Sequence, residues 1–437
     1  MKNIDLNKIK ELNNKFYKED KYEIMSNALL NNDLKNSIIK NNVKVNNRFN
    51  FEIDIKTMTA CNQKASGRCW IFAGLNVLRE IIAKKCNIKE FELSQSYVAF
   101  YDKLEKINYR LENIIELKDK DHDDRTLAHI LSEGIQDGGQ WDMFVNIVKK
   151  YGIVPKDVFD ETYQSSNTRN MNEIINTKIR KFASDVHKIN CEEEIRNLKE
   201  KTLDELYLFL CINFGVPCEK FDFEYVDNVG KYHLVEEYTP ISFFNEFIGN
   251  SIDEYLSIIN APTLDKPFNN VFTVKYVGNA IDGKDIEYLN LSIEDFKEIV
   301  IKQLKDNELV WFGCDCGKYS NDLGIWDDKI FDYKKSFGLD LEMDKADMLN
   351  YKVSAMDHAM VISGISFKNE KVNKWKIVNS WGTEKGNNGY YVMSDSWFDK
   401  FVYQAVVNKK YLNEFQIECL KKEKIQLQPW DPMGTLA

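Results

Sequence analysis

Apolar residues recur at intervals of three and four along several stretches of the chain, which is the spacing of one buried helix face. The strongest such run covers residues 69–85, and its apolar face consists of Ile71, Phe72, Leu75, Leu78, Ile81 and Ile82. The same spacing predicts helices over residues 94–106 and 141–151, the second of which is ended by Gly152. The N-terminal third of the chain is therefore predicted to be mainly helical.

The middle of the chain mixes two kinds of pattern. Helical spacing at residues 192–214, 241–258 and 293–306 alternates with strand-like runs such as residues 271–277. The pattern therefore predicts a mixed section between residues 155 and 308.

Three short strand-like runs follow closely in the last third, at residues 359–367, 375–378 and 390–393. Asn, Lys and Gly turns separate them, a pattern typical of antiparallel sheet. His358 and Asn379 are thereby placed at the ends of neighbouring strands.

A chain of 437 residues exceeds the size at which one hydrophobic core keeps growing, so several packed subdomains are expected. The pattern predicts an α+β fold with a helical part, a mixed section, an antiparallel β part and a C-terminal arm. Their expected boundaries are 1–154, 155–308, 309–419 and 420–437.

The formal net charge of -10 changes the range of possible partners. Affinity for nucleic acid depends on cationic contacts that release counterions from phosphates, so binding to DNA or RNA is not expected. Residues Met1 to Lys10 mix Lys and Asp without an apolar run, and no stretch of 18 apolar residues occurs. Neither an export signal nor a membrane span is predicted.

The nine cysteines show no disulfide framework in their spacing, which fits a reducing, cytoplasmic compartment. Cys314 and Cys316 could form half of a metal site, but no second Cys or His pair stands at ligand spacing. The alternative, two thiols at the end of a buried strand, is preferred. No metal or organic cofactor is therefore expected.

Cys69 stands where an apolar helix begins, directly after Gly67 and Arg68. A helix N-terminus carries a partial positive charge and unpaired N–H groups, which favour thiolate over thiol. Cys69 is therefore a candidate nucleophile. Gln63, six positions upstream, could return across the turn and donate its side-chain amide to an oxyanion, beside the Cys69 backbone N–H.

Only five histidines are available as a base for Cys69, at positions 122, 129, 187, 233 and 358. His122 lies among aspartates in what is predicted to be a solvated loop, and three of the others have undistinguished polar contexts. His358 opens a predicted strand and precedes Asn379 by 21 positions (379 minus 358). Asn379 could then hold the imidazole tautomer, while Trp381 screens that hydrogen bond from water.

These residues together resemble the papain superfamily of cysteine peptidases. The resemblance rests on Gln63, on Ser66-Gly67-Arg68-Cys69-Trp70, on His358-Ala359 and on Asn379-Ser380-Trp381-Gly382, in that order. It implies a papain-like fold of a helical and an antiparallel β subdomain. Ser66 stands where secreted members have a disulfide cysteine, in agreement with the cytoplasmic expectation.

Further motifs resemble the bleomycin hydrolase and aminopeptidase C family over nearly the whole chain. They are Glu92-Leu93-Ser94-Gln95-Ser96-Tyr97, Asp137-Gly138-Gly139-Gln140-Trp141 and the ending Pro429-Trp430-Asp431-Pro432-Met433-Gly434. The family's large helical insertion accounts for residues 155–308 and for the 289 positions (358 minus 69) between Cys69 and His358.

Four residues are expected from this resemblance to contact substrate: Gly138, Gly139, Trp381 and Ala437. The glycines would let a substrate backbone come close, although they could equally form a plain loop before the next helix. Two prolines make the tail non-helical, and a frayed end would be the default. The resemblance instead implies that the arm lies in the cleft, with the Ala437 carboxylate meeting the free amine of a peptide.

The resemblance thus implies a cysteine aminopeptidase that removes N-terminal residues from peptides, with hydrolysis of amides such as bleomycin possible. It also implies a homohexamer whose active sites face an internal chamber. Two alternatives stay open. One is an endopeptidase or acyltransferase with the same Cys-His-Asn set, and the other is a non-enzymatic scaffold or nucleic-acid-binding member.

Overall fold

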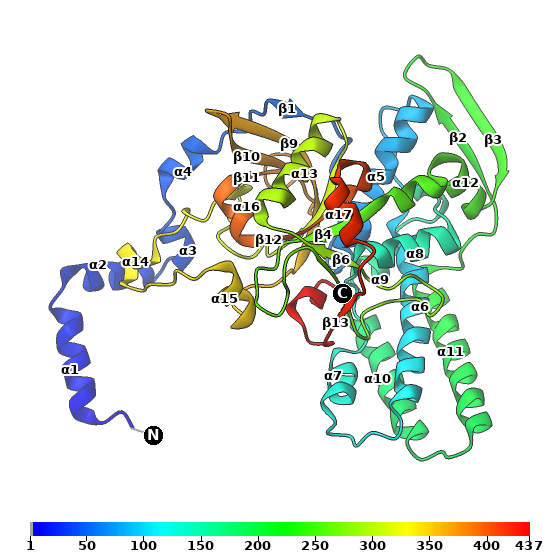
Figure 1. The fold of residues 1–437 in the computed structure, drawn as a ribbon, viewed down its shortest axis with the longest axis horizontal. Helices are drawn as coiled ribbons and strands as arrows, with labels where there is room; N and C mark the ends of the chain where they lie inside the picture. Colours follow the sequence, from blue (N-terminus) through cyan, green and yellow to red (C-terminus); the bar gives the residue numbers. More distant parts are fainter. Residues whose placement is uncertain (1–2) are drawn as a thin grey trace.

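The computed structural model describes residues 3–437. Its N-terminal residues form an arm that leaves the body of the molecule (Figure 1). The arm contains the short helices α1 (Leu6–Tyr17), α2 (Asp20–Leu29), α3 (Leu34–Ser37) and α4 (Asn41–Asn46). No residue of α1 or α2 is buried, although both carry large apolar side chains. The arm therefore presents apolar surface that the rest of this chain does not cover.

The helical part of the fold follows the arm. Its helices are α5 (Cys69–Cys86), α6 (Gln95–Glu116), α7 (Arg125–Glu133) and α8 (Trp141–Tyr151). The predicted helices at 69–85 and 141–151 match α5 and α8, whereas α6 runs ten residues beyond the predicted end at 106. Ser94 caps α6, where its hydroxyl accepts a 3.0 Å hydrogen bond from the Tyr97 N–H.

Two long helices, α10 (Arg169–Val186) and α11 (Glu192–Phe214), pack against α6 below the sheet in Figure 1. The short helices η1 (Lys156–Val158) and α9 (Tyr163–Ser166) precede them. After α11 come the exposed hairpin of β2 (Phe221–Val226) and β3 (Tyr232–Tyr238), then α12 (Pro240–Phe247) and η2 (Gly249–Glu254). The helix predicted over 241–258 is wrong in its second half, because residues 255–259 pair in the central sheet.

One sheet of eleven strands forms the other layer of the fold. Its strand order is β13-β5-β6-β4-β12-β7-β9-β10-β11-β8, and β1 pairs with β9 beside this path. The strands are β1 (Ile53–Asp54), β4 (Tyr255–Ile259), β5 (Asn270–Val274), β6 (Tyr288–Asn290), β7 (Val310–Cys314), β8 (Ile325–Trp326), β9 (His358–Lys368), β10 (Lys371–Val378), β11 (Tyr390–Ser394), β12 (Val402–Asn408) and β13 (Ile425–Leu427).

The three strands predicted in the last third match β9, β10 and β11. Strand β10 pairs antiparallel with β9 on one side and with β11 on the other. Strands β4, β5 and β6 belong to the section predicted as an insertion, yet they join the same sheet as the strands that follow its predicted boundary at residue 308. The division of the chain into four segments stays a prediction. The remaining helices are α13 (Ile293–Lys305), α14 (Tyr333–Phe337), α15 (Lys345–Asn350), α16 (Asp395–Phe401), η3 (Lys409–Tyr411), α17 (Glu414–Cys419) and η4 (Pro432–Gly434).

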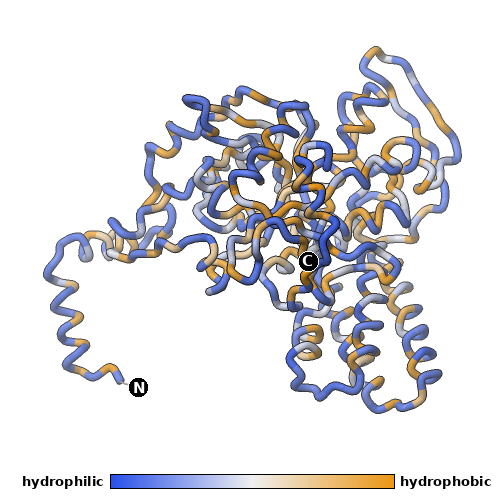
Figure 2. The backbone as a smooth tube through the Cα atoms, in the orientation of Figure 1, coloured by the Kyte–Doolittle hydropathy of each residue, from blue (hydrophilic) through white to orange (hydrophobic). Residues whose placement is uncertain are grey.

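The hydrophobic core lies where the helical layer meets the sheet. Figure 2 shows apolar residues concentrated inside the body and hydrophilic residues along the arm and the loops. Helix α5 packs directly on β9 and β7, and its residues Trp70, Ile71 and Phe72 are fully buried. Within residues 3–437, no helix combines the length and apolar character that crossing a membrane requires.

Candidate active site

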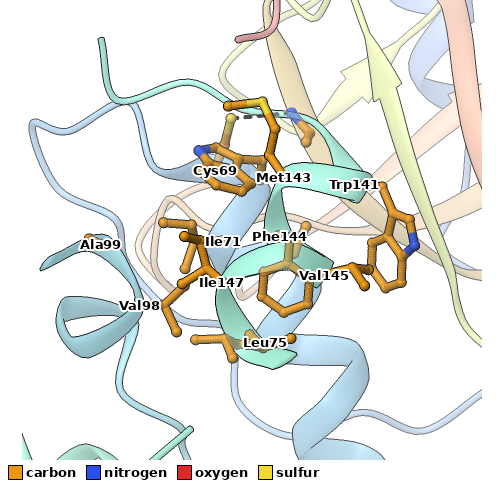
Figure 3. Close-up of a cluster of buried hydrophobic side chains, with 14 of the residues drawn as sticks. Cys69, Ile71, Leu75, Val98, Ala99, Trp141, Met143, Phe144, Val145 and Ile147 are labelled. Carbon is orange, nitrogen blue, oxygen red and sulfur yellow. Dashed lines mark hydrogen bonds between the residues drawn. The ribbon is translucent and has the colours of Figure 1, made fainter. Parts of the chain in front are cut away.

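Cys69 is the first residue of α5, so its sulfur lies at the N-terminal end of a buried helix. The Ala359 N–H, from the start of β9, donates a 3.4 Å hydrogen bond to the Cys69 sulfur. Figure 3 shows Cys69 next to Met143 and above the apolar cluster that joins α5, α6 and α8. The nucleophile predicted from sequence therefore stands on rigid, packed elements from both layers of the fold.

His358 opens β9 and is brought to the Cys69 side of the sheet by the same strand that supplies Ala359. Its Nε2 lies 2.8 Å from the Asn379 Oδ1, and both side chains are buried. The Trp381 indole stacks on the imidazole with ring centroids 4.8 Å apart. The structure thus brings His358, Asn379 and Trp381 together in the arrangement expected from their order in sequence.

A second hydrogen bond fixes which way the Asn379 amide points. The Ser380 N–H donates to the same Asn379 Oδ1 at 2.7 Å, and an N–H can only donate to the oxygen end of an amide. His358 must therefore donate from Nε2, so Nδ1 is the nitrogen left free to accept a proton in the neutral ring. The free nitrogen is the one available to the cleft that His358 and Cys69 line together.

Two hydrogen bonds hold the Gln63 side chain in place. Its Oε1 accepts a 2.6 Å hydrogen bond from the Ser380 hydroxyl, and its Nε2 donates to the Ser66 carbonyl at 2.7 Å. A side-chain amide carries two donor hydrogens, so one remains for a ligand in the cleft. Ser380 thus links the residue that orients His358 to the residue expected to bind an oxyanion.

Burial and local donors act in opposite directions on the nucleophile. Burial raises the pKa of the Cys69 thiol to about 12, while the N–H groups of Ala359 and Trp70 lower it. Burial also lowers the pKa of His358, and the bond from Asn379 opposes that change. A lone charge on either group is therefore costly. A thiolate beside an imidazolium removes both costs together, so the two groups must ionise as a pair.

The loop before Cys69 is anchored by Asp137, which the sequence analysis named in a motif without assigning it a role. Asp137 Oδ2 accepts a 2.9 Å hydrogen bond from the Gly67 N–H, and its Oδ1 pairs with Lys103 at 2.5 Å. Although burial opposes ionisation, Lys103 holds the pKa of Asp137 well below its usual range. The Asp137 carbonyl also accepts from the Trp70 indole at 2.6 Å. Asp137 therefore fixes Gly67 before Cys69 and Trp70 after it.

A buried ion pair stands next to the nucleophile, beside Ser66. Arg68 is 1% exposed, and its guanidinium donates to both Glu161 oxygens at 3.0 and 2.9 Å. Its Nε donates to the Ser66 hydroxyl at 2.9 Å. Sequence reasoning missed Glu161, which lies 93 positions from Arg68 and has no motif around it.

The two glycines of the Asp137-Gly138-Gly139 motif are required by close neighbours. A Cβ on Gly139 would lie 2.5 Å from the Trp70 ring, and one on Gly138 would lie 2.2 Å from the Leu436 carbonyl oxygen. Gly138 thus lines the cleft and also receives the C-terminal arm. Gly139 serves packing under Cys69, and it is not among the residues that line the cleft.

The C-terminal arm lies in the molecule and does not project from it. Leu436 is 4% exposed, and the Thr435 hydroxyl donates to the Met356 carbonyl at 2.8 Å. Thr435 and Leu436 line a cleft of about 500 Å³ together with Cys69 and His358. Ala437 lines a neighbouring cavity, while its carboxyl carbon would lie 3.4 Å from a Cβ on Gly138.

The other four histidines do not line the cleft that holds Cys69. His233 pairs with Asp227 on the exposed hairpin, and His187 lies 2.9 Å from the Lys118 carbonyl. Within residues 3–437, no group of three or more His, Cys, Asp or Glu side chains is arranged to hold a metal ion.

The model of the Peptidase C1-like family matches residues 3–434. The chain belongs to this family. It is 42% identical to an aminopeptidase C of Lactobacillus delbrueckii subsp. lactis over 100% of this chain and 99% of that protein. An aminopeptidase C of Listeria monocytogenes is 45% identical over 89% and 88% of the two chains, and the bleomycin hydrolase of Rattus norvegicus is 40% identical over 86% of each.

A solved structure titled PepW from Lactobacillus rhamnosis HN001 superimposes with a TM-score of 0.98. It is 42% identical and covers 100% of this chain and 99% of its own. The papain-like α+β fold is confirmed, as is the resemblance to aminopeptidase C and bleomycin hydrolase. The chain is a cysteine-type aminopeptidase C homologue.

Proposed function

We propose that this protein removes N-terminal residues from peptides by thiolate catalysis, with Cys69 as nucleophile. The observation that carries the proposal is the network in which Ala359 donates to Cys69 while Asn379 fixes the His358 tautomer. Three elements of a packed core hold that network: Cys69 begins α5, His358 and Ala359 begin β9, and Asn379 directly follows β10. Substrates would be peptides with a free amine, and amide compounds such as bleomycin are further candidates.

The proposed reaction begins with proton transfer from the Cys69 thiol to His358 Nδ1. The thiolate attacks the carbonyl carbon of the first peptide bond, and the oxyanion accepts hydrogen bonds from Gln63 Nε2 and the Cys69 N–H. His358 then gives its proton to the leaving amine, so a thioester and a shortened peptide form. Water, activated by His358, hydrolyses the thioester and returns the free thiol. Loss of one oxyanion donor typically costs about 10²- to 10³-fold in rate.

We also propose that the Ala437 carboxylate binds the amine of the substrate. The arm supports this, because Leu436 and Thr435 fill the cleft on the side of Gly138. A peptide that extended past its first residue in this direction would collide with Leu436. A carboxylate facing an ammonium group adds an attraction that a blocked amine would lose.

The proposal extends to the oligomeric state and the cellular location of the protein. We propose a homohexamer that encloses its active sites, and the exposed apolar side chains of α1 and α2 support contact with another copy. A cytoplasmic location agrees with nine cysteines that are all free in the structure. Neither a membrane nor nucleic acid is a proposed partner, given the net charge of -10.

The test of the nucleophile is Cys69→Ala, assayed with leucine 7-amido-4-methylcoumarin. We expect a loss of at least about 10⁴-fold in kcat, because removal of a catalytic nucleophile leaves only binding and oxyanion stabilisation. The matched control is Cys191→Ala, since Cys191 is exposed and remote from the cleft. Activity above a tenth of the parent value in Cys69→Ala would refute the proposal and favour the non-enzymatic alternative.

A further inference from the structure

A second cavity lies on the far side of the C-terminal arm, with a volume of about 410 Å³. Thr435 lines both this cavity and the catalytic cleft, as do Glu133, Ile135 and Gln136, so the two spaces adjoin each other at the arm. Its wall includes Tyr109 and Arg110 from α6, His129 from α7, Tyr276 from the loop after β5, and Trp430 and Ala437 from the arm. The proposed reaction uses none of the first five.

Arg110 is the unusual member of this wall. Its Nε is enclosed and has no hydrogen-bond partner, and within residues 3–437 its guanidinium forms no hydrogen bond or ion pair. Burial lowers the pKa of Arg110 to about 10, and the Tyr109 hydroxyl and the Glu133 carboxylate nearby offset this only in part. An arginine stays protonated at neutral pH even so. The cavity therefore contains a cation without a close counter-ion, which is costly unless a ligand supplies one.

The other charged groups of the wall do not fill this role. Lys106 is paired with Asp102 at 2.7 Å, and Asp431 is paired with Lys266 at 2.8 Å. Glu133 is exposed, and its carboxylate accepts a hydrogen bond from Gln136 at 2.7 Å. Lys352 also lines the wall, but it is exposed. Arg110 is thus the donor that is enclosed without a partner, whereas Glu133 and the terminal carboxylate add negative charge at the edge of the cavity. A ligand with one negative charge suits this balance better than a dianion.

Aromatic side chains form the remainder of the wall. The Arg125 guanidinium lies 3.7 Å from the Trp430 ring centroid, and the His129 ring meets the same indole edge-on at 6.0 Å. The Tyr276 hydroxyl donates to Glu116 at 3.0 Å, which fixes its ring. These rings are held in place by their own partners, so they offer a preformed apolar surface beside the free guanidinium.

We propose that this cavity binds a small organic carboxylate that carries an apolar or aromatic group. The carboxylate accepts hydrogen bonds from the Arg110 guanidinium, whose planar fork matches two carboxylate oxygens, and the apolar group lies against Trp430 and Tyr276. Free amino acids and N-blocked amino acids both have this chemistry. The site adjoins the catalytic cleft along the arm, but Cys69 and His358 are not part of its wall.

The experiment uses N-acetyl-L-phenylalanine as the carboxylate probe and N-acetyl-L-phenylalaninamide as the matched neutral probe. Binding to the full-length protein is measured by isothermal titration calorimetry. We expect saturable binding of the acid at one site per chain, and at least tenfold weaker binding of the amide. Equal binding of the two probes would overturn the proposal. So would simple competition of the acid with leucine 7-amido-4-methylcoumarin, because it would place the probe in the catalytic cleft.

Variants of Arg110 assign the effect to this cavity. Arg110→Gln is expected to lose at least tenfold in affinity for the acid, Arg110→Lys to keep part of it, and both to leave kcat unchanged. Unaltered affinity in a folded Arg110→Gln protein would overturn the assignment. L-phenylalanine distinguishes the two sources of the ligand: equal binding assigns the site to free amino acids, and weaker binding assigns it to N-blocked acids. Absence of saturable binding by either acid would overturn the proposal.

Discussion

Substitution of Asn379 by Ala tests whether the buried amide orients His358. The Asn379 Oδ1 accepts from His358 Nε2 at 2.8 Å, and both residues are excluded from solvent. A hydrogen bond to a charged group contributes about 1.5–3 kcal/mol, and each 1.36 kcal/mol of lost transition-state stabilisation is about tenfold in rate. Asn379→Ala is therefore expected to reduce kcat/KM by about 10- to 150-fold.

The pH profile of the same variant separates orientation from simple loss of structure. Burial lowers the pKa of His358, and the bond from Asn379 opposes that change. Removing Asn379 therefore lowers the pKa of His358 further. Because the reactive ion pair needs a protonated imidazole, the alkaline limb of the kcat/KM profile should move to lower pH.

The assay is hydrolysis of leucine 7-amido-4-methylcoumarin across pH, with Asn228→Ala as the control. The Asn228 side chain, in the exposed hairpin, donates a hydrogen bond to Asn87. It is not among the residues that line the cleft. The control should keep the parent rate and profile. A loss under threefold with an unmoved alkaline limb in Asn379→Ala would refute the orienting role of the amide.

Two further changes test the packing around the nucleophile. Glu161→Gln removes the partner of buried Arg68, and breaking such a pair is expected to cost about 3–5 kcal/mol in the free energy of unfolding, measured by urea denaturation. Gly139→Ala places a Cβ 2.5 Å from the Trp70 ring, and this overpacking is expected to cost about 1–3 kcal/mol and to lower Tm.

The controls for these two variants are chosen by their surroundings. Glu219→Gln removes an exposed carboxylate and should leave the urea midpoint unchanged. Gly317→Ala places its Cβ 3.6 Å from Asp357, an ordinary contact, so its Tm should stay near the parent value. A Glu161→Gln midpoint equal to that of its control would show that Arg68 needs no counter-ion. Likewise, an unchanged Tm in Gly139→Ala would show that the Trp70 ring moves freely.

The spacing of apolar residues was enough to predict helices that bury one face and strands that are buried on both faces. Helices α5 and α8 have apolar stripes that face the core, and β9 to β11 are short apolar runs between turns. The helical spacing and the strand-like runs are therefore both visible in the sequence. The prediction over 241–258 was wrong because a buried strand and a buried helix segment share apolar composition. Residues 255–259 become a strand through pairing with β12 and β6, which no local signal contains.

The candidate site divides in the same way. Cys69, His358, Asn379 and Gln63 lie in short motifs whose order is recognisable, and the structure brings them around one cleft. Glu161 reaches Arg68 from a distant loop, and Lys103 of α6 pairs with Asp137, so only the folded chain reveals these partners. The placement of Ala437 also depends on long-range packing of Leu436 against Gly138.

The most direct test of aminopeptidase action compares one short peptide with a free amine and with an acetylated amine, followed by mass spectrometry. The account predicts sequential loss of N-terminal residues from the free peptide and no cleavage of the acetylated one, because the Ala437 carboxylate requires an ammonium partner. Internal cuts in both peptides would contradict it. They would remove Ala437 from the mechanism and identify an endopeptidase with the same Cys-His-Asn set.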